Sequence, residues 1–428
     1  MKTKPEIFDF NKYAEDCVKC AKCVPTCTIH KINPDETTSP RGFIHLLSCA
    51  QNGELPLDRT AKKIFESCFL CAHCVSQCPS KVPTDTLIEF ARAEIAKKFG
   101  IAWYKRAAFF LLRHRGLLNI AAKAGFIVLP CGFSRHRNGM KARFSMPFIR
   151  KNRVIPSVAA KSFLKTYPER MDFGGDRTVA VFVGCMANYA YTGVGDSLLY
   201  ILRCLGINVF IPKDQLCCGA PSYFTGDLKT TKKLVKYNIE YFELFIDAVE
   251  AVIIPEATCS AMIIHDWAKV LANEPLWVER AERIAAKCFI ASQFLARNTN
   301  LLEILPEIPA EKRETLTYHD PCHARLAQGV FKEPRALLKN LCDLSEMENS
   351  STCCGFGGIT IQTDRHALAR AAGIEKARMI AATNARLVSA ECSACRVQLS
   401  DALERQGLAQ KFLHPLEIVA EYLRNPVS

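Results

Sequence analysis

Two N-terminal stretches share one cysteine spacing: Cys17-Val-Lys-Cys20-Ala-Lys-Cys23-Val-Pro-Thr-Cys27 and Cys68-Phe-Leu-Cys71-Ala-His-Cys74-Val-Ser-Gln-Cys78-Pro79. Cysteines at i, i+3 and i+6 let one tight loop place three thiolates on three corners of an iron–sulfur cubane. The fourth cysteine then begins a segment that reaches a second cluster, as in bacterial two-cluster ferredoxins. A zinc site would need pairs of Cys-x2-Cys and would leave a surplus thiol in each run. The spacing therefore predicts two [4Fe-4S] clusters.

The doubled run also predicts how the ligands are shared. Because the fourth cysteine of each run serves the other cluster, the first set is Cys17, Cys20, Cys23 and Cys78. The second set is Cys68, Cys71, Cys74 and Cys27. Thr28 follows Cys27 where the pattern usually has proline, which removes no ligand.

Length and composition indicate a multidomain globular protein. The chain has 428 residues, 49% hydrophobic and 23% charged, which fits two to three domains with sizeable cores. Its 22 cysteines are too widely spread for a small secreted disulfide scaffold. The N-terminus shows no apolar export segment, so we expect reduced cysteines in the cytosol. No window offers about 20 uncharged apolar residues, so a membrane-spanning helix is not expected.

Positive charge is concentrated in one segment. Lys and Arg number 56 against 43 Asp and Glu, a net charge of +13, yet residues 95–168 hold 16 Lys and Arg and no acidic residue. Large apolar residues accompany the basic ones there, as in Trp103-Tyr-Lys-Arg-Ala-Ala-Phe-Phe-Leu-Leu-Arg113. This composition favours a cationic amphipathic surface for an anionic membrane leaflet or an acidic partner. A solvated linker and a nucleic-acid-binding stretch are the alternatives.

The second half of the chain repeats one α/β unit. Cys185 and Cys322 each end a short β-rich run, a Cys-Cys-Gly triplet follows at 217–219 and 353–355, and amphipathic helices are predicted at 228–245 and 367–382. A second apolar run then leads to Cys259 in one unit and to Cys392-Ser-Ala-Cys395 in the other. These positions lie 137, 136 and 133 residues apart, which indicates a duplication. Cysteines at strand ends suit the carboxyl edge of a parallel sheet, where α/β sites gather.

This ordered set of motifs resembles the CCG-domain iron–sulfur subunit family over essentially the whole chain. The family includes the iron–sulfur subunits of glycolate oxidase, D-lactate oxidoreductases and anaerobic glycerol-3-phosphate dehydrogenase, and it is similar to the CCG-domain subunit of heterodisulfide reductases. Two stretches look most like the glycolate oxidase branch: Ser39-Pro-Arg-Gly42 and His414-Pro-Leu-Glu-Ile-Val-Ala-Glu-Tyr-Leu423.

The resemblance implies an α+β multidomain fold, in which an α-helical ferredoxin module precedes two duplicated α/β domains. We expect the ferredoxin domain at 1–95, a basic amphipathic connector at 96–170, the first CCG domain at 171–300 and the second at 301–428.

By the same resemblance the CCG cysteines hold metal centres. The second domain offers a full five-cysteine set for a further [4Fe-4S] cluster, cubane or non-cubane: Cys322, Cys353, Cys354, Cys392 and Cys395. The first domain offers Cys185, Cys217, Cys218 and Cys259, with Met262 where the fifth cysteine would stand. A thioether cannot bridge as a thiolate does, so an iron–sulfur cluster, a tetrahedral Zn²⁺ or no metal stay open there. Buried structural thiols are the alternative for the adjacent pairs.

Histidines flank one of these cysteines. His319 and His323 lie on either side of Cys322. A hydrogen bond from His323 to a cluster sulfur is one interpretation, and a structural role is the favoured one.

The motifs that are missing bear on function. No Gly-x-Gly-x-x-Gly after a strand and no Gly-x4-Gly-Lys-Ser/Thr loop occur in the sequence, so no flavin, nicotinamide or ATP site and no catalytic residue are predicted. The resemblance implies an electron-transfer subunit. An FAD-containing dehydrogenase subunit would oxidise a 2-hydroxy acid such as glycolate or D-lactate, and this chain would pass single electrons towards membrane quinone.

Other functions remain open at this point. The chain could be a heterodisulfide-reductase-like catalytic subunit or the iron–sulfur subunit of a glycerol-3-phosphate dehydrogenase. A nucleic-acid-binding role leaves four ordered cysteine motifs unexplained, so no nucleic-acid partner is expected. We expect a cytoplasmic protein, peripheral on the inner face of the cell membrane and docked on anionic lipid through residues 96–168.

Overall fold

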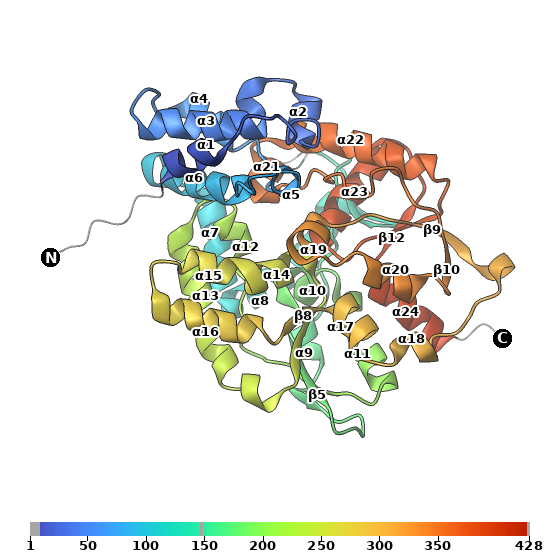
Figure 1. The fold of residues 1–428 in the computed structure, drawn as a ribbon. Helices are drawn as coiled ribbons and strands as arrows, with labels where there is room; N and C mark the ends of the chain where they lie inside the picture. The colour runs from blue at the N-terminus through green and yellow to red at the C-terminus, as the bar shows by residue number, and fades with distance from the viewer. Residues whose placement is uncertain (1–8, 146–148, 150, 426–428) are drawn as a thin grey trace.

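The N-terminal module is helical, as expected. The structure, a computed structural model, describes residues 9–145, 149 and 151–425, so a small part of the basic segment lies outside the described residues. Ser39 caps the helix Pro40–Gln51 by accepting from the Gly42 amide, with Pro40 as its first residue, a favourable start for a helix. Figure 1 shows the module at one end of the molecule. Its helices are α1 (Phe10–Asp16), α2 (Thr28–Ile32), α3 (Pro40–Gln51), α4 (Arg59–Phe65), α5 (His73–Ser76) and α6 (Thr84–Phe99).

The basic segment that follows is folded. It forms α7 (Trp103–Arg113), α8 (Arg115–Gly132) and a small antiparallel sheet of β1 (Phe133–His136), β2 (Gly139–Ala142) and β3 (Val154–Ile155). Lys105 Nζ lies 2.7 Å from Asp364 Oδ2, and Arg153 Nη2 donates to Gln362 Oε1 at 2.6 Å. Because buried cations of the segment pair with the C-terminal domain, it is not a solvated linker. Within the described chain, no helix has the length and apolar content needed to cross a membrane.

The first α/β unit has a five-stranded sheet in the order β4-β6-β5-β7-β8, with β4 (Arg170–Met171) antiparallel to the parallel remainder. Its parallel strands are β5 (Thr178–Val181), β6 (Asn208–Phe210), β7 (Ala251–Ile254) and β8 (Cys288–Ile290). Their helices are α9 (Phe163–Thr166), α10 (Gly184–Tyr189), α11 (Thr192–Cys204), α12 (Ala220–Tyr223), α13 (Leu228–Glu243), α14 (Ala257–Ala261), α15 (Trp267–Val270), α16 (Pro275–Ala285), α17 (Ala291–Arg297) and α18 (Leu301–Ile304).

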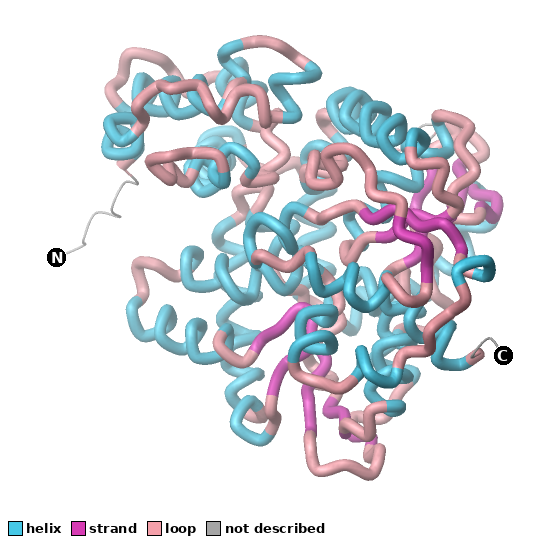
Figure 2. Tube along the Cα trace, turned by 45° about the vertical axis from the view of Figure 1, so that its right-hand side comes forward, coloured by secondary structure: helices cyan, strands magenta, loops and turns pink. Residues whose placement is uncertain are grey.

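The second unit repeats this topology. Its sheet runs β10-β9-β11-β12, all parallel, which matches the order β6-β5-β7-β8 of the first. Figure 2 shows the strands of the two units as separate groups. The strands are β9 (Glu314–Tyr318), β10 (Cys342–Leu344), β11 (Leu387–Ser389) and β12 (Lys411–Leu413), and the helices are α19 (Cys322–Gln328), α20 (Lys332–Leu338), α21 (Gly358–Thr363), α22 (His366–Ala382), α23 (Ser393–Arg405) and α24 (Pro415–Arg424). The duplicated α/β architecture is therefore confirmed.

The apolar cores cross the boundaries between these parts. Phe43 and Leu87 of the helical module belong to one buried cluster with Tyr223 and Phe242 of the first unit. A second cluster joins α11 of the first unit to α24 of the second, and Leu198 is among its members. Burial of shared apolar surface is the main force that holds these parts together.

Candidate metal centres

Each ferredoxin-type cysteine run lies on a loop with an uncommon backbone. Lys19 and Ala21 have φ of 53° and 62°, and Leu70 and Ala72 have φ of 55° and 56°. A residue with a side chain adopts this left-handed region at a cost of about 1–3 kcal/mol, and such residues cluster at functional sites. The same two positions are left-handed in both runs, so the two loops share one wrapped conformation.

Each wrapped loop surrounds a small hollow. One hollow is lined by Cys17, Cys20, Cys23 and Cys78, and a neighbouring one by Cys27, Cys68, Cys71 and Cys74. The structure thus places the fourth cysteine of each run beside the other run. Cys74 lines both hollows, so the two sets are adjacent.

The chemistry of these thiols suits iron–sulfur clusters. Burial raises the pKa of Cys27 to about 11 and the pKa of Cys68 to about 12, so a metal must displace a proton from each to gain its thiolate ligand. The amides of Leu70 and Val82 donate to Cys68 Sγ and Cys78 Sγ, both at 3.4 Å. Amide hydrogen bonds to the sulfurs stabilise bound thiolates and tune cluster potentials.

Arg92 of α6 holds the second loop in place. Its fully buried guanidinium donates to the carbonyl oxygens of Phe65, Glu66 and Cys68, and to that of Phe224 at 2.8 Å. Phe224 belongs to the first α/β unit, so this one side chain joins the cluster loop to that unit.

The five cysteines predicted in the second CCG domain gather at one sheet edge. Cys322 begins α19 after β9, Cys353 and Cys354 precede α21, and Cys392 and Cys395 lie at the start of α23. Cys354 Sγ lies 3.4 Å from Cys395 Sγ. Burial, followed by the nearby thiols of Cys71, Cys354 and Cys392, raises the pKa of Cys322. The set offers several convergent thiolates and fits an iron–sulfur centre.

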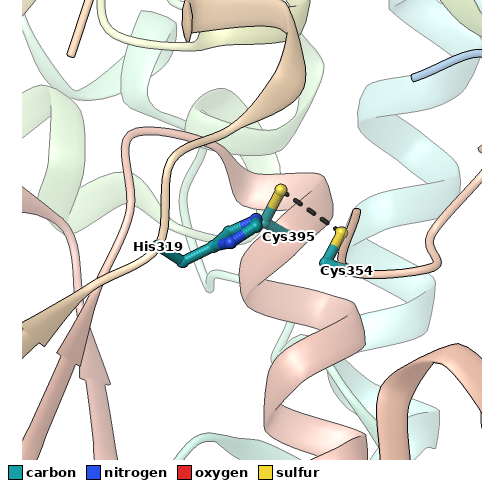
Figure 3. Close-up of side chains that lie close together, drawn as sticks. All are labelled: His319, Cys354 and Cys395. Atoms are coloured by element: carbon teal, nitrogen blue, oxygen red, sulfur yellow. Dashed lines mark hydrogen bonds between the residues drawn. The ribbon is translucent and has the colours of Figure 1, made fainter. Parts of the chain in front are cut away.

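His319 also belongs to this set. The sequence showed this residue only as a near neighbour of Cys322. The side chain follows β9, is 1% exposed, and has a ring nitrogen within 4.8 Å of Cys354 Sγ and Cys395 Sγ. Figure 3 shows the imidazole pointing at the two sulfurs. In the sequence, the indication that His319 could reach the site was its position three residues before Cys322. His323, the other flanking histidine, has its Nδ1 3.7 Å from Cys322 Sγ, and its ring stacks on Phe224 at 5.5 Å between ring centroids.

The four cysteines of the first CCG domain also come together. A chain of thiol contacts runs from Cys185 through Cys217 and Cys218 to Cys259. The neighbouring Cys218 thiol lowers and burial raises the pKa of Cys259, with a net rise to about 11. Such a set fits a tetrahedral metal or an iron–sulfur cluster.

A cation from the basic segment faces the first set. Arg115, the first residue of α8, lies close enough to Cys185 and Cys217 for their charges to act on it. Its Nε and Nη1 are buried and have no hydrogen-bond partner among the described residues. A guanidinium in this place would offset the negative charge of bound thiolates.

Sheet register corrects the expected fifth position of the first set. Val179 pairs with Ala251 as Leu316 pairs with Leu387, which aligns Cys259 with Cys395 and Glu256 with Cys392. Glu256 immediately precedes α14 as Cys392 immediately precedes α23. The position equivalent to the fifth cysteine is therefore Glu256, and the buried Met262 lies one turn beyond Cys259. The sequence offset of 133 matched Cys259 to the wrong cysteine of the Cys-x2-Cys pair.

The carboxylate of Glu256 is buried between the two units. It accepts from the Ser393 amide at 2.7 Å, and its charge raises the pKa of Cys185 and Cys259. Burial raises the pKa of Glu256 itself to about 7. The first site is thus chemically distinct from the second, with a carboxylate in place of a thiolate.

Contacts connect three of the four cysteine sets in sequence. The Cys71 thiol of the second ferredoxin loop and the Cys353 thiol lie close enough to act on each other: Cys353 lowers the pKa of Cys71, and Cys71 raises the pKa of Cys353. On the other side, Thr258 Oγ1 lies 3.5 Å from Cys392 Sγ, and Thr258 precedes Cys259 of the first CCG set. The second CCG set therefore lies between a ferredoxin-type set and the first CCG set.

Two family models match this chain. A 4Fe-4S dicluster domain covers residues 13–82, and a cysteine-rich domain covers 179–264 and again 316–400. A crystal structure of a hypothetical protein from Helicobacter pylori shares the fold, with a TM-score of 0.51 at 12% identity, over 98% of this chain and 77% of that one.

Named relatives are iron–sulfur or utilization proteins. A probable glycolate oxidase iron-sulfur subunit of Bacillus subtilis is 28% identical over 92% of this chain and 90% of its own. Lactate utilization protein A of Halalkalibacterium halodurans is 34% identical over 56% of this chain and 96% of its own. A subunit of the fumarate reductase (CoM/CoB) of Methanothermobacter marburgensis is 27% identical over 97% of this chain and 74% of its own.

Proposed function

The chain belongs to the family of oxidoreductase iron–sulfur subunits that join a 4Fe-4S dicluster domain to two cysteine-rich CCG domains, and we propose that it relays electrons from a flavoprotein dehydrogenase to an acceptor at the membrane. The observation that carries this proposal is the proximity of the Cys71 and Cys353 thiols, which lie near enough to shift each other's pKa. Centres whose ligands are such near neighbours are close enough for rapid electron transfer. Iron–sulfur clusters bound in these sets would accept and donate single electrons.

The exposure of the sets suggests a direction of flow. Cys20 of the first set is exposed, and the neighbouring Val18 is 66% exposed, so a partner can approach this set closely. The second ferredoxin set is more deeply buried, and the cysteines of the second CCG set are almost entirely so. We infer that electrons enter near Cys20, pass the set of Cys27 and reach the CCG centres.

The identity of the partner rests on the relatives. Their names refer to glycolate oxidase and to lactate utilization, which supports a flavin-containing subunit that oxidises a 2-hydroxy acid. A second candidate is a heterodisulfide-reductase-like catalytic role, favoured by the full five-cysteine set and by the likeness to a CoM/CoB fumarate reductase subunit. Glu256 in place of a cysteine argues against two equivalent catalytic centres.

The basic segment supplies the proposed membrane surface. Eight of the fifteen large apolar side chains exposed in the described chain lie between residues 103 and 144. On α8, where every residue is at least partly exposed, Ile120, Ile127 and Val128 are 68%, 65% and 63% exposed. Apolar side chains backed by Lys and Arg and by no acidic residue suit the interface of an anionic leaflet. Such a surface supports our proposal that the chain lies on the inner face of the cell membrane.

The relay is tested on the tagged full chain purified anaerobically with its partners. We expect a flavin-containing protein to copurify, at least about eight iron atoms per chain, and bleaching of cluster absorbance on addition of glycolate or D-lactate. Cys353→Ser should leave the ferredoxin iron in place and stop electron flow to the acceptor, while Cys204→Ser, at an exposed thiol, should change neither. Fewer than eight iron atoms, or no copurifying flavin, would contradict the proposal.

The membrane surface has its own test. The double variant Ile120→Glu/Ile127→Glu should abolish binding to vesicles that contain anionic lipid. The matched control Leu244→Glu/Leu276→Glu changes two side chains that are 79% and 77% exposed on the first CCG domain and should bind like the native chain. Equal binding of the two double variants to the vesicles would contradict the proposed membrane surface. So would binding of the native chain to double-stranded DNA with the same affinity as to the vesicles.

A further inference from the structure

A nitrogen atom is directed into the second CCG set. One ring nitrogen of His319 and the sulfurs of Cys354 and Cys395 all lie within 4.8 Å of one another. Figure 3 shows how these three side chains lie. All three residues are buried, at 1%, 4% and 3% exposure. The arrangement places one imidazole and two thiols around a common point.

The surroundings decide which nitrogen is free. Nδ1 lies 3.1 Å from the carbonyl oxygen of Ser350. A carbonyl oxygen can only accept, so Nδ1 carries the proton and donates it. The same oxygen accepts from Lys376 Nζ at 2.9 Å, which fixes its position. Nε2 therefore presents a lone pair, the form in which histidine binds metals.

Nε2 of His319 has no established hydrogen-bond partner among the described residues. It is buried and makes no well-aligned hydrogen bond to any described group. A buried acceptor without a partner is destabilising. In the metal-free chain a neighbouring S–H can face this nitrogen, but a cysteine bound to metal has lost that proton. A metal ion is then the partner that remains for Nε2.

The first CCG domain has no counterpart. The amide of His319 donates to Ser389 in the second sheet as the amide of Phe182 donates to Ile253 in the first. Phe182 thus occupies the equivalent place, fully buried and without a donor atom. The imidazole is a property of one site and no general requirement of the duplicated fold.

We propose that His319 Nε2 is a ligand of the metal centre held by the second CCG set, on the same metal ion as Cys354 or Cys395. The inference rests on the proposed function, in which this set holds an iron–sulfur centre. Replacing an anionic thiolate by a neutral imidazole raises the reduction potential of an iron–sulfur centre. The second CCG centre would then attract electrons from the all-cysteine set of Cys27.

The test uses the full chain, purified anaerobically after growth with ¹⁵N-histidine. Pulsed paramagnetic resonance of the second CCG centre should show hyperfine coupling to a directly bound nitrogen that changes on ¹⁵N labelling and disappears in His319→Gln. His323→Gln, which changes the other histidine beside Cys322, should keep the coupling. His319→Cys should keep the iron and lower the reduction potential, because a thiolate replaces the imidazole.

The outcomes separate the inference from the function on which it rests. A centre that is present, and whose spectrum is the same in His319→Gln as in the native chain, overturns ligation by His319 and leaves the relay intact. Iron limited to the two ferredoxin clusters, in the native chain and in all three variants, overturns the iron–sulfur assignment of the CCG set itself.

Discussion

Single residues distinguish the two CCG sites. Cys392 is replaced by Glu256 and His319 by Phe182, although the strands, loops and helices around them correspond. Every cysteine could be located in the sequence. The match between Cys259 and its equivalent in the second unit, Cys395, became clear only from the pairing of β5 with β7. Side chains at equivalent backbone positions therefore decide what each site can bind.

The glycines of the two Cys-Cys-Gly triplets should differ in tolerance. Gly219 and Gly355 have φ of 101° and 88°, so alanine is strained by about 1–3 kcal/mol at either place. A Cβ at Gly355 would also lie 2.5 Å from Ala372 Cβ, whereas at Gly219 the nearest atom is Thr231 Cγ2 at 3.3 Å. We expect Gly355→Ala to lower the free energy of unfolding more than Gly219→Ala, measured by urea denaturation. Equal losses would show that the contact with Ala372 is unimportant.

His414 should make stability depend on pH. Its Nε2 donates to the carbonyl of Pro255 at 3.0 Å, and burial lowers its pKa from 6.5 to about 3. Between these values the unfolded chain binds the proton and the native chain does not, so stability falls as pH drops below 6.5. The expected loss is about 1.4 kcal/mol at about pH 5.5.

The variant that isolates this effect is His414→Asn. Asparagine still caps α24 but loses the hydrogen bond to Pro255, which should lower the free energy of unfolding by about 1 kcal/mol near neutral pH. The difference between the native chain and the variant should then shrink on acidification. Parallel pH profiles of the two proteins would rule out His414 as the source.

Among the structural elements, those of the basic segment differ most from what the sequence predicted. Its composition predicted an amphipathic surface, and α7 and α8 carry one. The small sheet β1–β3 was not predicted, because its strands are short and are held by the second CCG domain. Glu404 of α23 contacts both His136 and Lys141, an arrangement that brings residues more than 260 positions apart together.

Glu404→Gln should loosen this sheet. The glutamate lies 2.9 Å from His136 Nε2 and pairs with Lys141, and a neutral amide loses most of this attraction, about 1 kcal/mol for a partly exposed pair. Hydrogen exchange at residues 133–142 should become several-fold faster, while α23 stays protected. Glu314→Gln, which removes the exposed pair with Arg386, is the control and should leave hydrogen exchange at residues 133–142 unchanged. Unchanged exchange in both variants would contradict the role of Glu404.

At the scale of the whole molecule, the parts share their cores. Phe224 lies in the cluster that includes the ferredoxin helices, stacks on His323 of the second unit, and gives its carbonyl to Arg92. One loop thus touches all three parts, so the free energies of unfolding of these parts are coupled.

Arg92→Met should uncouple them. Four carbonyl oxygens would lose a charged donor in a buried place, which lowers the free energy of unfolding by about 3–5 kcal/mol. In the native chain, cluster absorbance and the fluorescence of Trp267 and Trp277 should change together on denaturation. In the variant, cluster absorbance should be lost first. Arg41→Ala, which breaks an exposed pair with Glu36, should cost less than about 1 kcal/mol. Coincident transitions in Arg92→Met would contradict the coupling.

The helical ferredoxin-type module, the duplicated α/β units and their cysteines could be predicted from the sequence, because cluster ligands need local spacing and strands need local apolar runs. Which groups meet across those units could not be predicted and became visible only in the folded chain. Glu256 took the place of Cys392 through strand register, His319 reached Cys354 and Cys395 across a sheet edge, and Cys71 met Cys353 between domains. Such contacts join residues far apart along the chain, and packing alone sets their distances.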